Sequence, residues 1–441
     1  MTLSLDAVRA RVLSQKERLP SLYGDFDFDA LPERFTDAPS LSDLKDRSFP
    51  GIAVRGEDLA LVRHYTMLGD VVADAYAALL PRYGFHRLVA MLTTACAQGV
   101  DAVPDAPPEL AAFIGAMEAT PDWVDMGMVR EGARLMRNDA ANVAPLAIRG
   151  AFLATFLNKY AALPMALTGA LGHASAARRV NETATFFAVT TLPGAMERHG
   201  EGFKAAAMVR LMHSMVRVNA LRSGRWDRAV YGVPIPQVDQ MPAGLIWAFL
   251  RAYEVVRAGR GFTREERAQV EFHRYRCFLL GLPEDLLSDT PEGILSLMIA
   301  RGSTLRAGFD DETCGALIRA TLSAYLPPDR SLKYRAFDAV ERRFSTGFFV
   351  RYFLQGDVAR AAAMGVELSV ADRLVFWALA PLLMGRMALY DALLRVPGLS
   401  GAVDDALVRK IRRLLARYGH AEFVSDAARY RPTTQAVVAP A

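Results

Sequence analysis

Apolar positions recur at helical spacing along most of this chain, from Glu57 onward. The segments are rich in Ala, Leu, Met and Arg, which favour helices, and contain few of the β-branched alternations typical of strands. The sequence therefore predicts an all-α fold, with helices at residues 57–81, 84–99, 108–118, 125–137, 141–171, 176–191, 201–221, 242–258, 264–280, 291–302, 311–325, 332–355, 370–396 and 403–419.

The breaks between these helices are too short to be domain linkers. Gly232-Val-Pro-Ile-Pro236 and Leu326-Pro-Pro-Asp329 are turns, and no repeat of fixed period is present. We therefore expect a single large helical body over residues 57–425. An irregular arm rich in Pro, Asp and Ser precedes it over residues 1–56, and a flexible tail follows over residues 426–441.

Hydrophobic residues make up 52% of the chain, which indicates a large core or an apolar ligand chamber. The most apolar stretch, residues 151–177, is interrupted by Asn158, Lys159, Pro164 and His173. It therefore falls short of the ~20 apolar residues that a membrane-spanning helix needs. We expect a buried pair of helices here and no transmembrane span.

The formal net charge of +4 is small for 441 residues, and the arginines are scattered among acidic residues, so nucleic acid is not expected as a partner. Three separated cysteines, Cys96, Cys277 and Cys314, give no zinc or disulfide pattern. The N-terminus has no apolar signal core, which indicates a cytoplasmic protein. No feature of the sequence specifies the oligomeric state.

His213 lies in an apolar helix together with two arginines. Arg210, His213 and Arg217 are spaced i, i+3 and i+7 and so project from one side of the helix. If that side is buried, the arginines need anionic partners, and haem propionates would serve while a neutral imidazole binds the iron. The helical pattern alone allows equally that this side faces water.

A second polar group precedes this helix, where Arg179 and Thr183 stand one turn apart. A guanidinium and a hydroxyl on the open side of a cofactor could hydrogen-bond dioxygen and stabilise charge that moves onto it. The same spacing is common on solvated helices, which is the simpler interpretation of this pair in isolation. His64 and His199 are interpreted as structural and surface residues respectively.

Four elements in order resemble the oxygenase family that contains the latex clearing proteins (rubber oxygenases) and the MpaB-type oxygenases. They are Arg179-x-x-x-Thr183, then Val209-Arg-Leu-x-His-x-x-x-Arg217, then Trp226-Asp227, and finally the segment at residues 232–240. The resemblance covers roughly residues 60–330. The agreement in order and separation is more specific than any one element.

The resemblance implies a globin-like core that binds noncovalent haem b, with His213 as the proximal ligand and Arg179 and Thr183 on the distal side. Arg210, Arg217 and Met212 are then candidate haem contacts. Relatives use dioxygen to cleave isoprenoid carbon–carbon double bonds into carbonyl products. We therefore expect a haem-dependent oxygenase acting on an apolar alkene, with dioxygen as co-substrate.

One position departs from the family. Some rubber oxygenases carry a lysine just before the threonine that can cap the iron, whereas this chain has Glu182. Glu182 is either a general base or an ion-pair partner of Arg178 or Arg179, of which pairing is favoured. Two other function classes remain open: a haem-binding sensor or carrier without turnover, and a helical interaction protein without a cofactor.

Overall fold

A computed structural model of the 441-residue chain describes residues 4–36, 54–167, 173–224 and 226–418. The all-α prediction is confirmed: these residues contain no β-strand, and their extended pairing is limited to an isolated antiparallel bridge between Phe35 and Leu305. The sequence predicts one helical body over residues 57–425, whereas the chain divides into two compact units. Unit 1 is Met1–Leu135 with Pro193–Ala307, and unit 2 is Met136–Leu192 with Gly308–Ala441.

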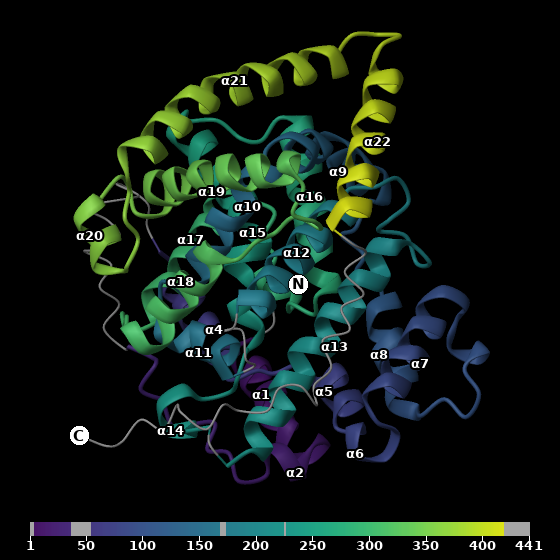
Figure 1. Ribbon diagram of the computed structural model, residues 1–441. Helices are drawn as coiled ribbons and strands as arrows, with labels where there is room; N and C mark the ends of the chain where they lie inside the picture. Colours follow the sequence, from purple (N-terminus) through teal and green to yellow (C-terminus); the bar gives the residue numbers. More distant parts are fainter. Residues whose placement is uncertain (1–3, 37–53, 168–172, 225, 419–441) are drawn as a thin grey trace. The chain divides into compact units, whose positions relative to one another are not determined.

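Unit 1 is built around helix α13 (Figure 1), which contacts α5, α7 and α16. Its helices are α1 (Leu5–Arg18), α2 (Pro20–Tyr23), α4 (Gly56–Tyr65), α5 (Val71–Ala77), α6 (Leu80–Tyr83), α7 (Phe85–Gln98), α8 (Pro108–Glu118), α13 (Glu201–Arg222), α14 (Arg228–Tyr231), α15 (Met241–Arg257), α16 (Arg264–Leu279) and α17 (Pro291–Thr304), with short 3₁₀ turns at Val100–Ala102, Gln237–Gln240 and Glu284–Leu286. Helix α9 (Met126–Asn142) carries the chain from unit 1 into unit 2.

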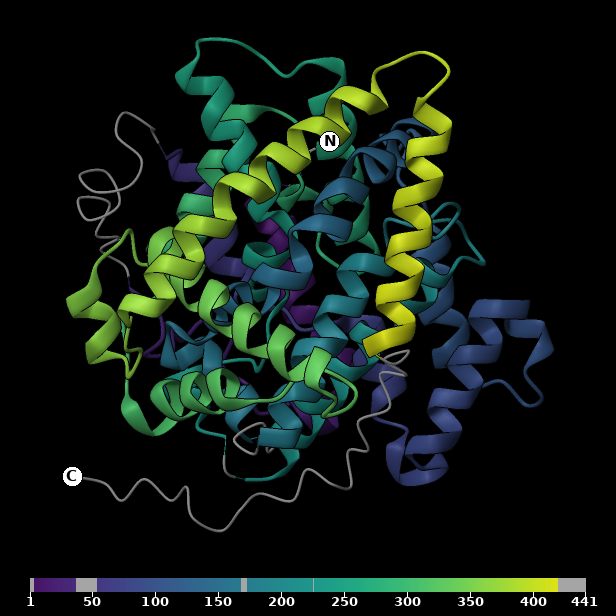
Figure 2. The same cartoon turned by 45° about the horizontal axis from the view of Figure 1, so that its top comes forward.

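Unit 2 is centred on the packing of α10 against α19, and α21 covers α19 in turn (Figures 1 and 2). Its helices are α10 (Ala144–Leu153), α11 (Lys159–Leu167), α12 (His173–Val189), α18 (Ala316–Ser323), α19 (Leu332–Phe353), α20 (Val358–Ala363), α21 (Val370–Leu394) and α22 (Ser400–Tyr418), with short turns at Ala154–Phe156 and Asp311–Gly315.

Three predictions about the elements were wrong. The expected irregular arm contains helix α1, because Ser4 caps its first turn by accepting a hydrogen bond from Ala7 N. The expected helix at 57–81 is interrupted between α4 and α5, where Asp70 becomes an N-cap. The expected helix at 141–171 breaks into α10, a 3₁₀ turn and α11. The predicted C-terminal tail at 426–441 lies outside the described residues.

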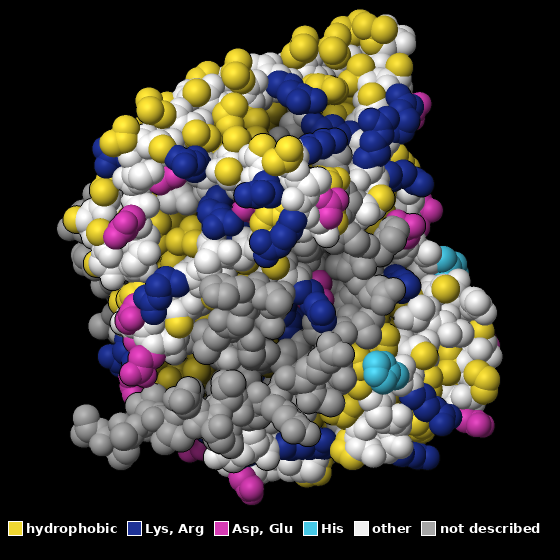
Figure 3. All heavy atoms as spheres, viewed as in Figure 1, with side chains coloured by type: hydrophobic (Ala, Val, Ile, Leu, Met, Phe, Trp, Pro, Cys, Tyr) yellow, Lys and Arg dark blue, Asp and Glu magenta, His cyan; other side chains and the backbone are white. Residues whose placement is uncertain are grey.

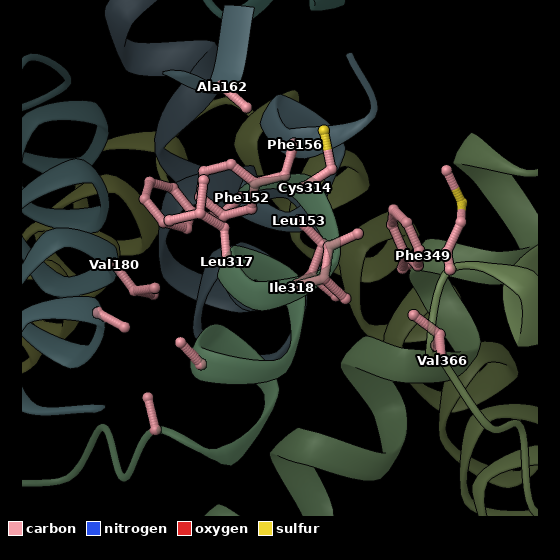
Figure 4. Packing of buried hydrophobic residues seen from close by; sticks show 14 of the residues in the cluster. Phe152, Leu153, Phe156, Ala162, Val180, Cys314, Leu317, Ile318, Phe349 and Val366 are labelled. Atoms are coloured by element: carbon pink, nitrogen blue, oxygen red, sulfur yellow. The ribbon is translucent and has the colours of Figure 1, made fainter. Parts of the chain in front are cut away.

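The core of unit 2 depends on a buried arginine as well as on apolar packing. Phe152, Leu317 and Phe349 belong to the apolar cluster drawn in Figure 4. Arg149, fully buried beside this cluster, donates to Glu341 Oε2 at 2.9 Å and to the carbonyl of Thr321 at 2.7 Å. This guanidinium thereby links α10, α18 and α19, and burial raises the pKa of the Glu341 carboxyl although Arg149 opposes the rise.

Helix α21 is the one helix among the described residues that is long and apolar enough to cross a membrane. This differs from the sequence analysis, which placed the most apolar stretch at residues 151–177. The 25-residue helix packs against α19 and α22 along one side, yet only 6% of its apolar window is buried. Its outward side is therefore an exposed apolar surface.

Close approach of α10 to α19 requires a glycine at position 150, since an added Cβ would lie 2.5 Å from the carbonyl oxygen of Ser345. We predict that Gly150→Ala lowers the free energy of unfolding by about 1–3 kcal/mol, because backbone must move to make room. Gly385→Ala is the control: no atom lies within 4 Å of its Cβ position. Urea unfolding followed by circular dichroism should show no loss, or a gain of up to about 1 kcal/mol, for the control. Equal midpoints for the two variants would contradict this packing.

Candidate active site

Helix α13 presents His213 on a narrow accessible face. Between residues 205 and 218 of this helix, three side chains are only partly buried: Val209, His213 and Val216. Their spacing of i, i+4 and i+7 places them on one face. The imidazole is therefore flanked by apolar side chains on the partly accessible face of this stretch of α13.

Arg210, on the adjacent side of α13, forms a bidentate ion pair with Asp70 at the start of α5. Its Nε and Nη2 atoms lie 2.7 and 2.9 Å from the two carboxylate oxygens, and both residues are buried. Burial opposes ionisation of Asp70, but the Arg210 charge and hydrogen bonds outweigh it and lower the pKa of the carboxyl. Gly281, at φ +89°, leaves no room beside the pair for a Cβ.

Arg217 forms a second buried pair one turn beyond His213. It donates to Asp74, to the carbonyls of Pro234 (2.8 Å) and Ile235, and to Ser214. Tyr23 donates a further hydrogen bond of 2.8 Å to Asp74. Burial raises the pKa of the Asp74 carboxyl, and the Arg217 charge offsets this only in part. Arg217 and Asp74 are fully buried, so each depends on the other for charge compensation.

These two ion pairs show that the side of α13 that carries Arg210 and Arg217 is buried. The alternative that it faces water is wrong, because Arg210 and Arg217 are 5% and 0% exposed. The anionic partners that burial required are Asp70 and Asp74 of the chain itself. The sequence analysis missed both acids, although their i, i+4 spacing in Leu-Gly-Asp-Val-Val-Ala-Asp was a signal: two carboxylates on one face of an otherwise apolar helix.

The segment at residues 232–240 closes over the same end of α13. Trp226 Nε1 donates to the carbonyl of Gly232 at 2.7 Å, and Gln237 N donates to the carbonyl of Leu68 at 2.9 Å. Asp239 accepts hydrogen bonds from Arg34 and Arg301, each at 2.8 Å. Trp226 and the segment at residues 232–240 therefore position the two backbone carbonyls that accept hydrogen bonds from Arg217, those of Pro234 and Ile235.

The other predicted site residues lie on α12 in unit 2. Glu182 is buried, and its Oε2 lies 3.6 Å from Nη1 of Arg179, whose side chain is 17% exposed. The pairing of Glu182 with Arg179 that the sequence analysis favoured is thus present. Thr183 is partly buried one residue further along. His213 and its neighbours, including the buried Met212, belong to unit 1.

The remaining histidines have other environments. His199 Nδ1 lies 3.1 Å from the carbonyl oxygen of Cys96, in the loop before α13. His273 is buried, stacks on Trp247 at 5.3 Å, and has a pKa well below the usual value because of burial and the Arg276 charge. His64 lines a cavity of about 470 Å³ in unit 1, together with Arg63 and Met67. None of the predicted site residues lines that cavity.

The donor set fits a haem iron. Within the described residues no three His, Cys, Asp or Glu side chains gather as a metal site. A porphyrin supplies nitrogen ligands itself, so the protein need not gather a cluster of ligands, and a single histidine imidazole is one common ligand that proteins provide to haem iron. His213, between Val209 and Val216, offers an imidazole in apolar surroundings, as an apolar macrocycle requires.

This helical fold corresponds to a known class of oxygenases. A family profile described as "ER-bound oxygenase mpaB/B'/Rubber oxygenase, catalytic domain" matches residues 140–385, which contain both helices. The chain belongs to this oxygenase family.

A solved structure supports the fold. The chain is similar to a latex clearing protein (LCP) in the closed state, with a TM-score of 0.55 and 21% sequence identity over 86% of this chain and 95% of that one. No curated protein sequence matches the chain. At this identity the likeness concerns the arrangement of helices and leaves the chemistry to the residues themselves.

Removing the ion pair between Arg217 and Asp74 should strongly lower the stability of the fold. We predict that Asp74→Asn lowers the free energy of unfolding by about 3–5 kcal/mol, because Arg217 would remain as a buried charge without its counterion. The control is Asp29→Asn, which removes the exposed pair of Asp29 with Arg9 and should cost less than about 1 kcal/mol. Chemical unfolding of the two variants measures the difference. Equal losses would show that the buried pair does not hold α5 to α13.

The pKa of Asp70 gives a pH dependence. Because the pKa is lower in the folded chain than in the unfolded one, ionised Asp70 favours folding above about pH 4, and this contribution is lost as the pH falls through the folded value. The difference in melting temperature between the wild-type protein and Asp70→Asn should therefore be constant from about pH 7 to 5 and shrink below about pH 4. A difference that grows on acidification would contradict the assignment.

Proposed function

We propose that this member of the oxygenase family is a haem b-dependent oxygenase in which His213 is the axial protein ligand of the iron. The observation that carries the proposal is the partly accessible face of α13, where an imidazole stands between two valines in a stretch, residues 205–218, that is otherwise buried. When bound, the haem would supply an iron centre for the activation of dioxygen.

In this proposal the two buried pairs orient His213. Arg210 precedes it by three residues and Arg217 follows it by four, so α13 is fixed to α5 on both sides of the imidazole. Both guanidiniums are engaged by protein carboxylates, and we therefore assign these arginines a positioning role instead of the predicted contact with propionates. Met212, buried next to His213, remains a predicted contact of the porphyrin edge.

We further propose that Arg179 and Thr183 of α12 are the residues that would act on dioxygen, as the resemblance of their sequence element to the oxygenase family implies. The Arg179 guanidinium and the Thr183 hydroxyl are hydrogen-bond donors that would orient dioxygen and stabilise negative charge on it. Glu182, paired with Arg179, would hold that guanidinium in place and could accept a proton from substrate. The proposed substrate is an apolar alkene, isoprenoid compounds included, and the proposed products are carbonyl compounds from double-bond cleavage.

The iron ligand is tested by haem content. We predict that protein produced with haem supplied shows a Soret band, and that His213→Ala retains less than about a tenth of the wild-type haem, as expected for loss of an axial ligand. His86→Ala, at an exposed position on α7, is the matched control and should retain full haem. The pyridine haemochrome assay gives the ratio of haem to protein. Full haem in His213→Ala would rule out this ligand.

The same preparations separate an oxygenase from a carrier. An oxygenase consumes dioxygen in the presence of isoprenoid alkenes and yields carbonyl products detectable by mass spectrometry, and His213→Ala does neither. A haem sensor or carrier would bind haem and dioxygen reversibly without product, and a colourless protein would indicate a helical interaction protein.

A further inference from the structure

Helix α21 exposes a row of large apolar side chains. Val370, Leu374, Trp377, Leu382, Met384 and Leu389 are each between 57% and 72% exposed. Single exposed leucines are ordinary, but contiguous apolar surface of this kind marks an interaction site in a soluble protein. Figure 3 shows it as a hydrophobic ridge along α21.

The opposite side of α21 packs against other helices of unit 2. Phe376 is 4% exposed and packs on the Phe344 ring at 5.3 Å between centroids. It lies so close to α19 that a Cβ added at Gly347 would stand 2.7 Å from the Cβ of Phe376. Asp391 accepts a hydrogen bond of 2.7 Å from Asn138 Nδ2. The helix is therefore anchored along its length by its inner side, and the outer row takes no part in that packing.

The exposed charged side chains of α21 are arginines, and the neighbouring helix α22 exposes more arginines than acidic residues. Arg373 and Arg386 are exposed on α21 itself, and its two acidic residues are engaged elsewhere: Asp372 caps the helix with Ser369, and Asp391 binds Asn138. The neighbouring helix α22 adds three more exposed arginines, Arg409, Arg412 and Arg413. Lys and Arg side chains gather below the ridge in Figure 3.

We propose that α21 docks unit 2 on an anionic lipid membrane, lying in the headgroup region with its outer row inserted. An apolar face with arginines at its margins and a tryptophan within it is the composition of helices that lie in the membrane interface. The arginines bind lipid phosphates, while the apolar row leaves water. The inference is independent of the haem assignment, although such docking would bring the chain to the place where apolar alkenes accumulate.

Two other occupants fit less well. A second copy packed face to face would bring Arg373 and Arg386 against the same residues of its partner, without exposed acids on α21 to receive them. A membrane-spanning α21 would have to leave the aromatic packing of Phe376 and would carry Arg386 into hydrocarbon. A helix lying in the interface keeps its inner contacts and leaves the arginines among headgroups.

The test is sedimentation of the full chain with vesicles of phosphatidylcholine, with and without phosphatidylglycerol. Wild-type protein should bind vesicles that contain phosphatidylglycerol and be released by high salt. The double variant Leu374→Ser with Leu382→Ser should bind about tenfold or more weakly, because two apolar side chains no longer insert. The matched control is Leu250→Ser with Leu332→Ser, at positions 50% and 82% exposed on other helices, which should bind like wild type.

A charge variant and two further measurements complete the design. Arg373→Glu with Arg386→Glu should lose the preference for phosphatidylglycerol. Alkaline carbonate should release the bound wild-type protein, and ultracentrifugation without lipid should show no self-association that depends on Leu374 and Leu382. Binding that is absent in the wild type, or unchanged in the Leu374/Leu382 variant and in the Arg373/Arg386 variant alike, overturns the proposal. So does retention after carbonate, which indicates a spanning helix, or a dimer lost only in the leucine variant, which indicates a second copy.

Discussion

Two buried ion pairs between α5 and α13 are the constraint on which the candidate site depends. Arg210–Asp70 and Arg217–Asp74 lie on either side of His213 along α13, in surroundings where an uncompensated charge would cost several kcal/mol. Because each charge needs its partner at hydrogen-bonding distance, the pairs fix the rotation of α13 and its height against α5. The direction in which the imidazole projects follows from that rotation.

In unit 2, a buried arginine paired with carboxylates likewise links helices, at a place apart from the predicted site residues. Arg149 is buried among Glu341, Asp338 and backbone carbonyls, and it fastens α10 to α19 where glycine at position 150 allows the helices to approach. Both units thus use buried arginines as multidentate links between helices, since a guanidinium can satisfy several acceptors at once. On α12 of unit 2, by contrast, the Arg179–Glu182 pair is longer, at 3.6 Å, and less tightly enclosed.

The sequence predicted what depends on local pattern and missed what depends on pairing between distant segments. The periodicity of apolar residues predicted most helices of both units, including α21, which was expected at 370–396 and is found at Val370–Leu394. It could not show that Asp70 and Asp74 compensate the arginines of α13, about 140 residues later in the chain, because nothing local to either helix specifies the partner. For the same reason, the division into two units was not visible: the chain changes unit at residues 135, 192 and 307 without a polar linker.

The central claim is that His213 is the iron ligand on a helix held in register by its flanking ion pairs. Its most direct test is chemical rescue of His213→Gly by free imidazole, followed by the iron–imidazole stretching band in the resonance Raman spectrum of the reduced protein. The band should be present in the wild type, absent in the variant, and restored by imidazole, because the cavity left by the side chain remains framed by Val209 and Val216. A band that persists in His213→Gly without added imidazole would contradict it.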